Sequence, residues 1–162
     1  ELIASGRYTK EELFPAIAHK SRDNARTPMP WNDGENAGFT TGTPWIPLNP
    51  NFKEINVQEQ LSRSDSVFHY YQKLISIRKT NDIVVYGDYH LLCEDDETIF
   101  AYTRTLGNEQ LLVVCNFSTE DRKFDFGQFA QDNVKILISN SSTDPRKSGV
   151  MSAYGAIVLK ID

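Results

Sequence analysis

The sequence contains little cysteine, little tryptophan and no long apolar run. Its 162 residues include two cysteines and two tryptophans, and its formal net charge at pH 7 is -5. Two cysteines do not make a disulfide framework, so we interpret Cys93 and Cys115 as small buried hydrophobes of a protein in a reducing cytoplasm. The acidic balance argues against nucleic-acid partners and anionic membrane surfaces, and no segment approaches the roughly 20 apolar residues of a membrane helix.

Motifs that hold cofactors or metals are missing as well. The sequence has no zinc-protease, nucleophile-elbow, phosphate-loop or dinucleotide-binding pattern, so we expect no cofactor and no metal site. His19, His69 and His90 are scattered along the chain, which favours surface or packing roles. The acidic run at residues 95–97 is typical of a solvated hairpin turn.

The sequence pattern changes near residue 81, from helix and loop signals to strand signals. Before that point, the capping box Thr9–Glu12 predicts a helix over residues 10–19, and a second one, Ser62–Asp65, predicts a helix over residues 65–80. Residues 21–53 are predicted to be loop because they are rich in Pro, Gly, Asn and Thr. After that point, β-branched and aromatic runs alternate with turns and predict strands at residues 83–86, 89–93, 98–105, 110–117, 122–126, 134–139 and 154–161.

These patterns predict a mainly β fold with an antiparallel β-sandwich over residues 81–162. The first 80 residues offer little core, and a loop as long as 21–53 indicates a missing scaffold. We therefore expect residues 1–80 to be the end of a larger domain. No basic-then-apolar leader follows Glu1, and we expect the chain to be part of a longer protein.

The segment from Ser21 to Trp45 is the candidate binding loop. Arg22 and Arg26 carry planar guanidinium groups that hold a carboxylate or bridge two sugar hydroxyls, and with Asp23 they can equally fasten the loop to its scaffold. Its three large aromatics suit either stacking on a sugar face or plugging the loop into the scaffold. Both interpretations stay open on composition alone. These aromatics are Trp31, Phe39 and Trp45.

An ordered series of motifs adds a resemblance. It comprises Arg22-Asp23-Asn24-Ala25-Arg26-Thr27-Pro28-Met29-x-Trp31, Ala37-Gly38-Phe39-Thr40, Pro44-Trp45, Asn49-Pro50-Asn51-Phe52-Lys53-Glu54-Ile55-Asn56-Val57, Ser66-Val67-Phe68-His69-Tyr70-Tyr71 and Val113-Val114-Cys115-Asn116-Phe117. This series resembles the α-glucosidase branch of glycoside hydrolase family 13, which includes oligo-1,6-glucosidases, glucan 1,6-α-glucosidases, trehalose-6-phosphate hydrolases and sucrose isomerases. The family usually has glutamine where this chain has Pro30.

The resemblance implies a fold and a site. The family fold is a (β/α)8 barrel followed by an antiparallel Greek-key type β-sandwich, so residues 1–80 match the end of the barrel and residues 81–162 match the sandwich. In the family, the aspartate nucleophile, the glutamate acid/base and a third aspartate come earlier in the chain. The resemblance assigns Arg26 to the pocket for the terminal glucose, with Arg22 and Asp23 as supports, and assigns this chain no catalytic residue.

The function implied is that of the C-terminal part of an intracellular retaining α-glucosidase that hydrolyses short α-1,6-linked glucosaccharides. The chain alone is expected to be inactive, and its expected partners are its own upstream barrel and the sugar. A trehalose-6-phosphate hydrolase or a sucrose isomerase is the alternative parent. A different class of function is a non-catalytic β-sandwich that stabilises the barrel or binds glucan through exposed aromatics such as Tyr89, Phe124 or Phe126.

Overall fold

The computed structural model describes residues 2–162. Contacts divide the chain into two units, one ending at His69 and the other spanning Tyr70–Asp162. The first unit contains the helices α1 (Lys10–Lys20) and α2 (Val57–Ser62) and three short 3-10 turns at Arg22–Ala25, Glu35–Gly38 and Pro50–Lys53. Helix α3 (Val67–Thr80) crosses the division.

The predicted helix over residues 10–19 is confirmed as α1. Its capping box forms as expected, because the Thr9 hydroxyl accepts the Glu12 N–H and the Glu12 carboxylate accepts the Thr9 N–H. The second predicted capping box is wrong. Ser62 is the last residue of α2, and the Ser66 hydroxyl accepts the N–H of His69 at the start of α3 instead, at 3.3 Å.

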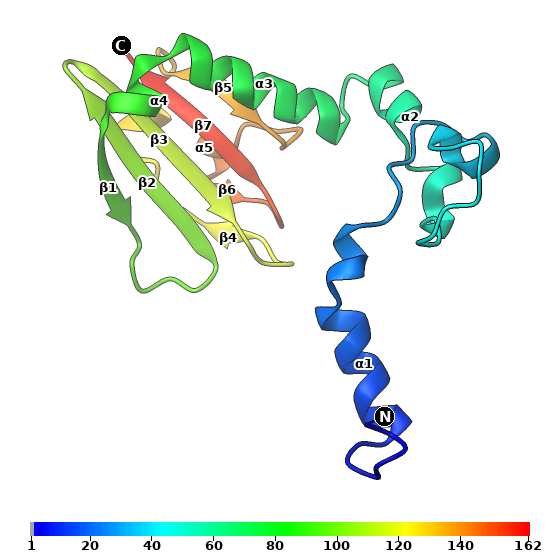
Figure 1. Cartoon of the computed structure of the whole chain (residues 1–162). Coiled ribbons are helices and arrows are strands. Elements are labelled where there is room, and N and C mark those ends of the chain that lie inside the picture. The colour runs from blue at the N-terminus through cyan, green and yellow to red at the C-terminus, as the bar shows by residue number, and fades with distance from the viewer. Residues whose placement is uncertain (1) are drawn as a thin grey trace. The chain divides into compact units, whose positions relative to one another are not determined.

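The second unit is built on a five-stranded antiparallel sheet in the order β1-β2-β3-β7-β5 (Figure 1). A second sheet pairs two short strands, β4 and β6. The strands are β1 (Asp88–Leu92), β2 (Ile99–Leu106), β3 (Glu109–Asn116), β4 (Arg122–Lys123), β5 (Lys135–Ser139), β6 (Val150–Met151) and β7 (Ala156–Ile161), with the short helix α5 (Pro145–Ser148) before β6.

The hydrophobic core lies between these two layers. One face of the large sheet contributes alternate residues of β2, β3 and β7, which is the periodicity of a strand with one buried face. The opposite layer contributes Phe126, Phe129, Val134 and Met151. The predicted antiparallel β-sandwich is therefore confirmed. Buried residues of the core are Ile99, Ala101, Leu112, Val114, Phe126, Phe129, Val134, Met151, Ile157 and Leu159.

The predicted strand at residues 83–86 is wrong, because these residues form the short helix α4 (Asp82–Tyr86). Contacts with the rest of the unit outweigh the strand preference of the β-branched residues in this segment. Ile83 is fully buried, and the Arg104 guanidinium on β2 donates hydrogen bonds to the carbonyls of Ile83 and Gly87 at 3.1 and 2.7 Å. A Cβ on Gly87 would lie 2.6 Å from the Ile83 carbonyl oxygen, so glycine is needed where α4 ends.

Other strands differ from the predicted ones mainly in where they begin and end. The strand predicted at 122–126 is only two residues long, because Phe124 and Phe126 turn their rings toward the core and pack edge to face at 5.0 Å. Strand β6 was not predicted, because Val150–Met151 is too short to carry a strand pattern. The expected burial of both cysteines is wrong for Cys93, which is exposed, while Cys115 is half-buried.

Among residues 2–162, no helix combines the length and apolar character needed to cross a membrane.

Candidate functional site

The candidate loop begins directly at the end of α1. Ser21 ends the helix, and its hydroxyl accepts the N–H of Asp23 at 3.3 Å, which starts the 3-10 turn Arg22–Ala25. The N–H of Arg26 donates to the Asp23 carbonyl at 3.0 Å and closes this turn. The turn therefore fixes the backbone at Arg22, Asp23 and Arg26 through local hydrogen bonds.

The side chains of Arg26 and Asp23 form a loose ion pair. Arg26 Nη1 lies 3.7 Å from Asp23 Oδ1, and the two side chains are 56% and 65% exposed. Pairs with this exposure contribute little to stability, because water screens them and two long side chains lose freedom. Arg22 is exposed as well. Within the first unit, none of the three sequence-predicted site residues is buried, so Arg26 keeps its donors available for another acceptor.

The next part of the loop closes around Ala37. This residue is fully buried, and its carbonyl accepts the N–H groups of Trp31 and Asn32 at 2.8 and 3.2 Å. Asn36, Ala37 and Gly38 all have positive φ, at 48°, 54° and 66°. A left-handed alanine is uncommon and costs backbone energy, so the surrounding hydrogen bonds must hold it in place.

A buried asparagine, Asn56, ties this loop to α2. Its side-chain oxygen accepts the Glu59 N–H at 2.9 Å and caps α2, while its amide donates to the Phe52 carbonyl at 2.9 Å. Sequence reasoning missed this residue, although the Asn56-to-Glu59 spacing is that of a helix cap. The N–H of Val57 then donates to the carbonyl of Pro30 at 2.9 Å. Pro30 takes part in this hydrogen bond through its backbone carbonyl, which a residue of any type would offer.

The large aromatic side chains of the loop are exposed within the first unit. Trp31 and Phe39 are about half exposed, and Trp45 is 89% exposed. None of the three rings is therefore buried among residues 2–69.

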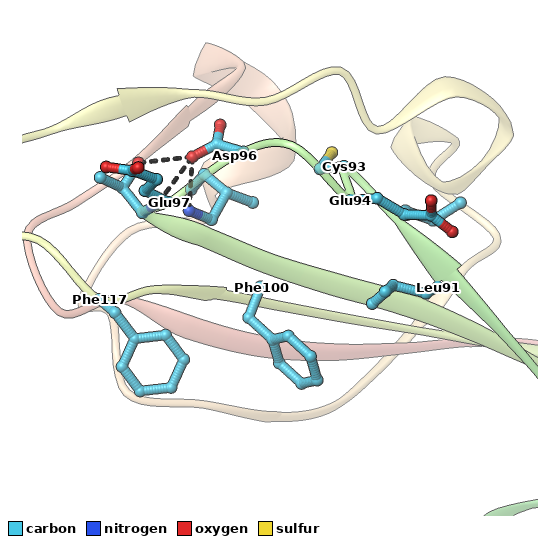
Figure 2. Close-up of a pocket in the computed structure, with 10 residues that line it drawn as sticks. Leu91, Cys93, Glu94, Asp96, Glu97, Phe100 and Phe117 are labelled. Carbon is cyan, nitrogen blue, oxygen red and sulfur yellow. Dashed lines mark hydrogen bonds between the residues drawn. The ribbon is translucent and has the colours of Figure 1, made fainter.

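The acidic hairpin of the second unit is held together by one of its own carboxylates. Asp96 Oδ1 accepts hydrogen bonds from the backbone N–H groups of Thr98 and Ile99 and from the Thr98 hydroxyl, at 2.8 to 2.9 Å (Figure 2). These donors lower the pKa of the Asp96 carboxyl. The predicted hairpin turn is therefore confirmed, with Asp96 as its internal cap. Across residues 2–162, the structure gathers no three His, Cys, Asp or Glu side chains that could hold a metal ion.

The aromatics named for a glucan-binding sandwich do not form one platform. Tyr89 is 53% exposed, but Phe126 is 4% exposed and belongs to the core, and Phe124 packs against that core. Exposed rings at Phe124 and Phe126, which the glucan-binding alternative needs, are therefore absent, because their strand ends early and their side chains turn inward.

Comparison with known protein families shows to which family this chain belongs. A family model described as alpha amylase, catalytic domain, matches residues 4–87. The chain belongs to the alpha-amylase family. A second model, described as maltogenic amylase, C-terminal domain, matches residues 89–157.

Individual relatives agree with this assignment. The oligo-1,6-glucosidase of Parageobacillus thermoglucosidasius is 57% identical over 135 residues, which are 83% of this chain and 24% of that protein. The crystal structure of Bacillus licheniformis trehalose-6-phosphate hydrolase has a TM-score of 0.88 and 41% identity, and covers 98% of this chain and 30% of its own. The crystal structure of isomaltulose synthase from Klebsiella sp. LX3 has a TM-score of 0.86 and 37% identity, with coverage of 99% and 29%. The chain thus spans about a quarter of the length of its curated family relatives.

Proposed function

We propose that this chain works as the C-terminal part of a cytoplasmic retaining α-glucosidase that hydrolyses short α-1,6-linked glucosaccharides. The observation that carries the proposal is the 57% identity to an oligo-1,6-glucosidase over most of the chain. In this proposal residues 1–80 end the catalytic barrel and residues 81–162 are its C-terminal β domain. The matches of the two family models to residues 4–87 and 89–157 support that division.

The chemistry of such an enzyme needs two carboxyl groups beside the scissile bond. One attacks the anomeric carbon, and the other protonates the leaving oxygen and later activates water. In the proposal both carboxyl groups belong to the part of the enzyme upstream of these residues. This chain supplies the last active-site loop, on the face of the barrel where βα loops build the site.

Within that loop, Arg26 is the residue proposed to contact the terminal glucose. Its guanidinium can hold two sugar hydroxyls, or fix a neighbouring carboxylate that does so. The weak ion pair with Asp23 supports this role, because a partner 3.7 Å away leaves most donors of Arg26 free. Arg22 and Asp23 act as supports, since they lie in the same 3-10 turn and Asp23 closes it.

The test compares the 162-residue chain with the full-length enzyme on isomaltose and p-nitrophenyl α-glucoside. We expect turnover by the full-length enzyme and none above blank by the chain alone. Trehalose 6-phosphate and sucrose serve as the competing substrates. Preferential hydrolysis of trehalose 6-phosphate, or isomerisation of sucrose, would replace the 1,6-glucosidase assignment with one of the other two subfamilies.

A further inference from the structure

The candidate loop of the first unit carries a hollow that the proposed role of Arg26 does not use. Its volume is about 600 Å³, which falls within the range of roughly 300–1,000 Å³ of small-molecule sites. Such sites combine an aromatic or apolar surface with a few polar groups that orient the ligand. The hollow has both kinds of group. It is lined by Glu35, Gly38, Phe39, Thr40 and Thr41.

Hydrogen bonds within residues 36–42 hold the segment that forms this hollow. The Asn36 amide donates to the Gly42 carbonyl at 3.1 Å, and the N–H of Phe39 donates to the Asn36 carbonyl at 3.0 Å. The N–H of Gly42 donates to the Thr40 hydroxyl at 3.1 Å. Asn36 has a φ of 48°, a left-handed conformation that costs energy and is found most often where function requires it. The segment therefore holds Phe39 through its own contacts.

The groups around the hollow match the two surfaces of a glucose unit, an apolar C–H face and a rim of hydroxyl groups. Phe39 is 48% exposed and offers a flat apolar ring to the C–H face. Glu35 is exposed, and among residues 2–162 its carboxylate enters no ion pair, so its oxygens can accept hydrogen bonds from sugar hydroxyls. The Thr40 hydroxyl accepts from Gly42 and keeps its own hydrogen to donate.

We propose that this hollow binds the third glucose unit of an α-1,6-linked chain, with Phe39 against its apolar face and Glu35 accepting from its hydroxyls. The inference rests on the proposed function, in which Arg26 takes the terminal glucose, so that every further unit lies on the leaving-group side of the scissile bond. The exposed lining suits a unit far from the buried reaction centre. A protein segment packed over Phe39 fits less well, because it would also desolvate the unpaired Glu35 carboxylate.

Chain-length kinetics of the full-length enzyme test the proposal. Phe39→Ala should lower the ratio of kcat/KM for isomaltotriose to kcat/KM for isomaltose several-fold, because only isomaltotriose reaches the hollow. Phe39→Tyr keeps the ring and should keep the ratio, and Glu35→Gln should lower it less than Phe39→Ala. Phe14→Ala is the matched control, since Phe14 on α1 is 56% exposed and does not line the hollow. A wild-type ratio in Phe39→Ala, or an equal loss on both substrates, would overturn the proposal.

Hydroxyl-radical footprinting of the wild-type full-length enzyme measures binding independently of catalysis. Relative to Phe14, Phe39 should be modified several-fold more slowly when isomaltotriose is added, and glucose at the same concentration should have no such effect. A Phe39 that is unreactive without sugar, or equally reactive with isomaltotriose, would overturn the proposal. Protection of Phe39 in an enzyme that does not hydrolyse isomaltose would refute the proposed function alone. Hydrolysis of isomaltose without protection of Phe39 would refute the third-glucose site alone.

Discussion

The guanidinium of Arg26 lies 3.7 Å from the carboxylate of Asp23, and both side chains are more than half exposed. In the full-length enzyme, we expect Arg26→Ala to lower kcat/KM by about a hundredfold or more, because a charge-assisted contact with bound sugar is worth about 3 kcal/mol. Steady-state kinetics on isomaltose measure this. Arg63→Ala is the matched control, since Arg63 forms a similar exposed pair with Asp65 at 3.2 Å. Unchanged kinetics for Arg26→Ala would show that Arg26 only supports the loop.

Gly38 lies in the most constrained part of the candidate loop. Its φ is +66°, and a Cβ added there would lie 2.6 Å from the side-chain nitrogen of Asn32. Gly107→Ala is the control, since Gly107 has φ +59° and no atom within 4 Å of an added Cβ. Both alanines incur about 1–2 kcal/mol of left-handed backbone strain. Only Gly38→Ala should also move the loop and reduce kcat/KM of the full-length enzyme, and equal kinetics for the two variants would contradict this.

Asn116 should contribute to the stability of the second unit. It is 2% exposed, and its amide donates to the carbonyls of Glu120, Met151 and Ser152 while its oxygen accepts from Ser118. Asn116→Ala removes these side-chain hydrogen bonds at a buried position, so we expect a loss of about 2–3 kcal/mol in the free energy of unfolding. Urea denaturation followed by circular dichroism measures the loss. The exposed Asn133→Ala should leave the midpoint unchanged.

The pair of Asp144 and Arg146 should make stability depend on pH. Arg146 Nη2 lies 2.6 Å from Asp144 Oδ2, and the side chains are only 10% and 18% exposed. This hydrogen bond lowers the pKa of Asp144. The pKa of Asp144 in the folded state lies below its unfolded-state value of about 4, so the ionised carboxylate stabilises the fold above that pH. This stabilisation is lost as the pH falls through the folded-state pKa.

Melting temperatures of the wild type and of Asp144→Asn between pH 2 and pH 7 test this prediction. The wild type should be the more stable of the two at pH 7, and the difference should shrink below about pH 4. Asp65→Asn is the comparison. Arg63 lowers the pKa of Asp65 as well, but this pair is exposed, so its pH-dependent difference should be smaller. A difference between wild type and Asp144→Asn that stays constant with pH would refute the titration of Asp144.

The sequence predicts the elements whose stability is local. The helix that begins after Thr9 and the hairpin at Asp96 are set by nearby capping and turn residues, and both form as expected. Tertiary contacts decided the others. Residues 83–86 follow a strand pattern, yet a buried Ile83 and an arginine on a distant strand hold them as a helix. The left-handed Ala37 gave no sequence signal, because alanine is common in every kind of structure.

The candidate site was predictable only in part. The resemblance to the family assigned Arg26 to the glucose pocket, and the structure adds its loose pair with Asp23. The buried cap at Asn56 was readable from its spacing to Glu59, whereas the 69% exposure of Phe117 was not. Strand alternation shows that neighbouring residues face opposite ways, but not which face a second layer covers.

The position of β7 in the large sheet has a consequence for biosynthesis. This strand follows all the other strands of the sheet in sequence, yet it lies between β3 and β5 and contributes Ile157 and Leu159 to the core. The sheet cannot close until residues 156–161 have been made and have left the ribosome. Until then, β3 presents an unpaired edge, and the nascent chain depends on the β1–β2–β3 meander and on protection from self-association.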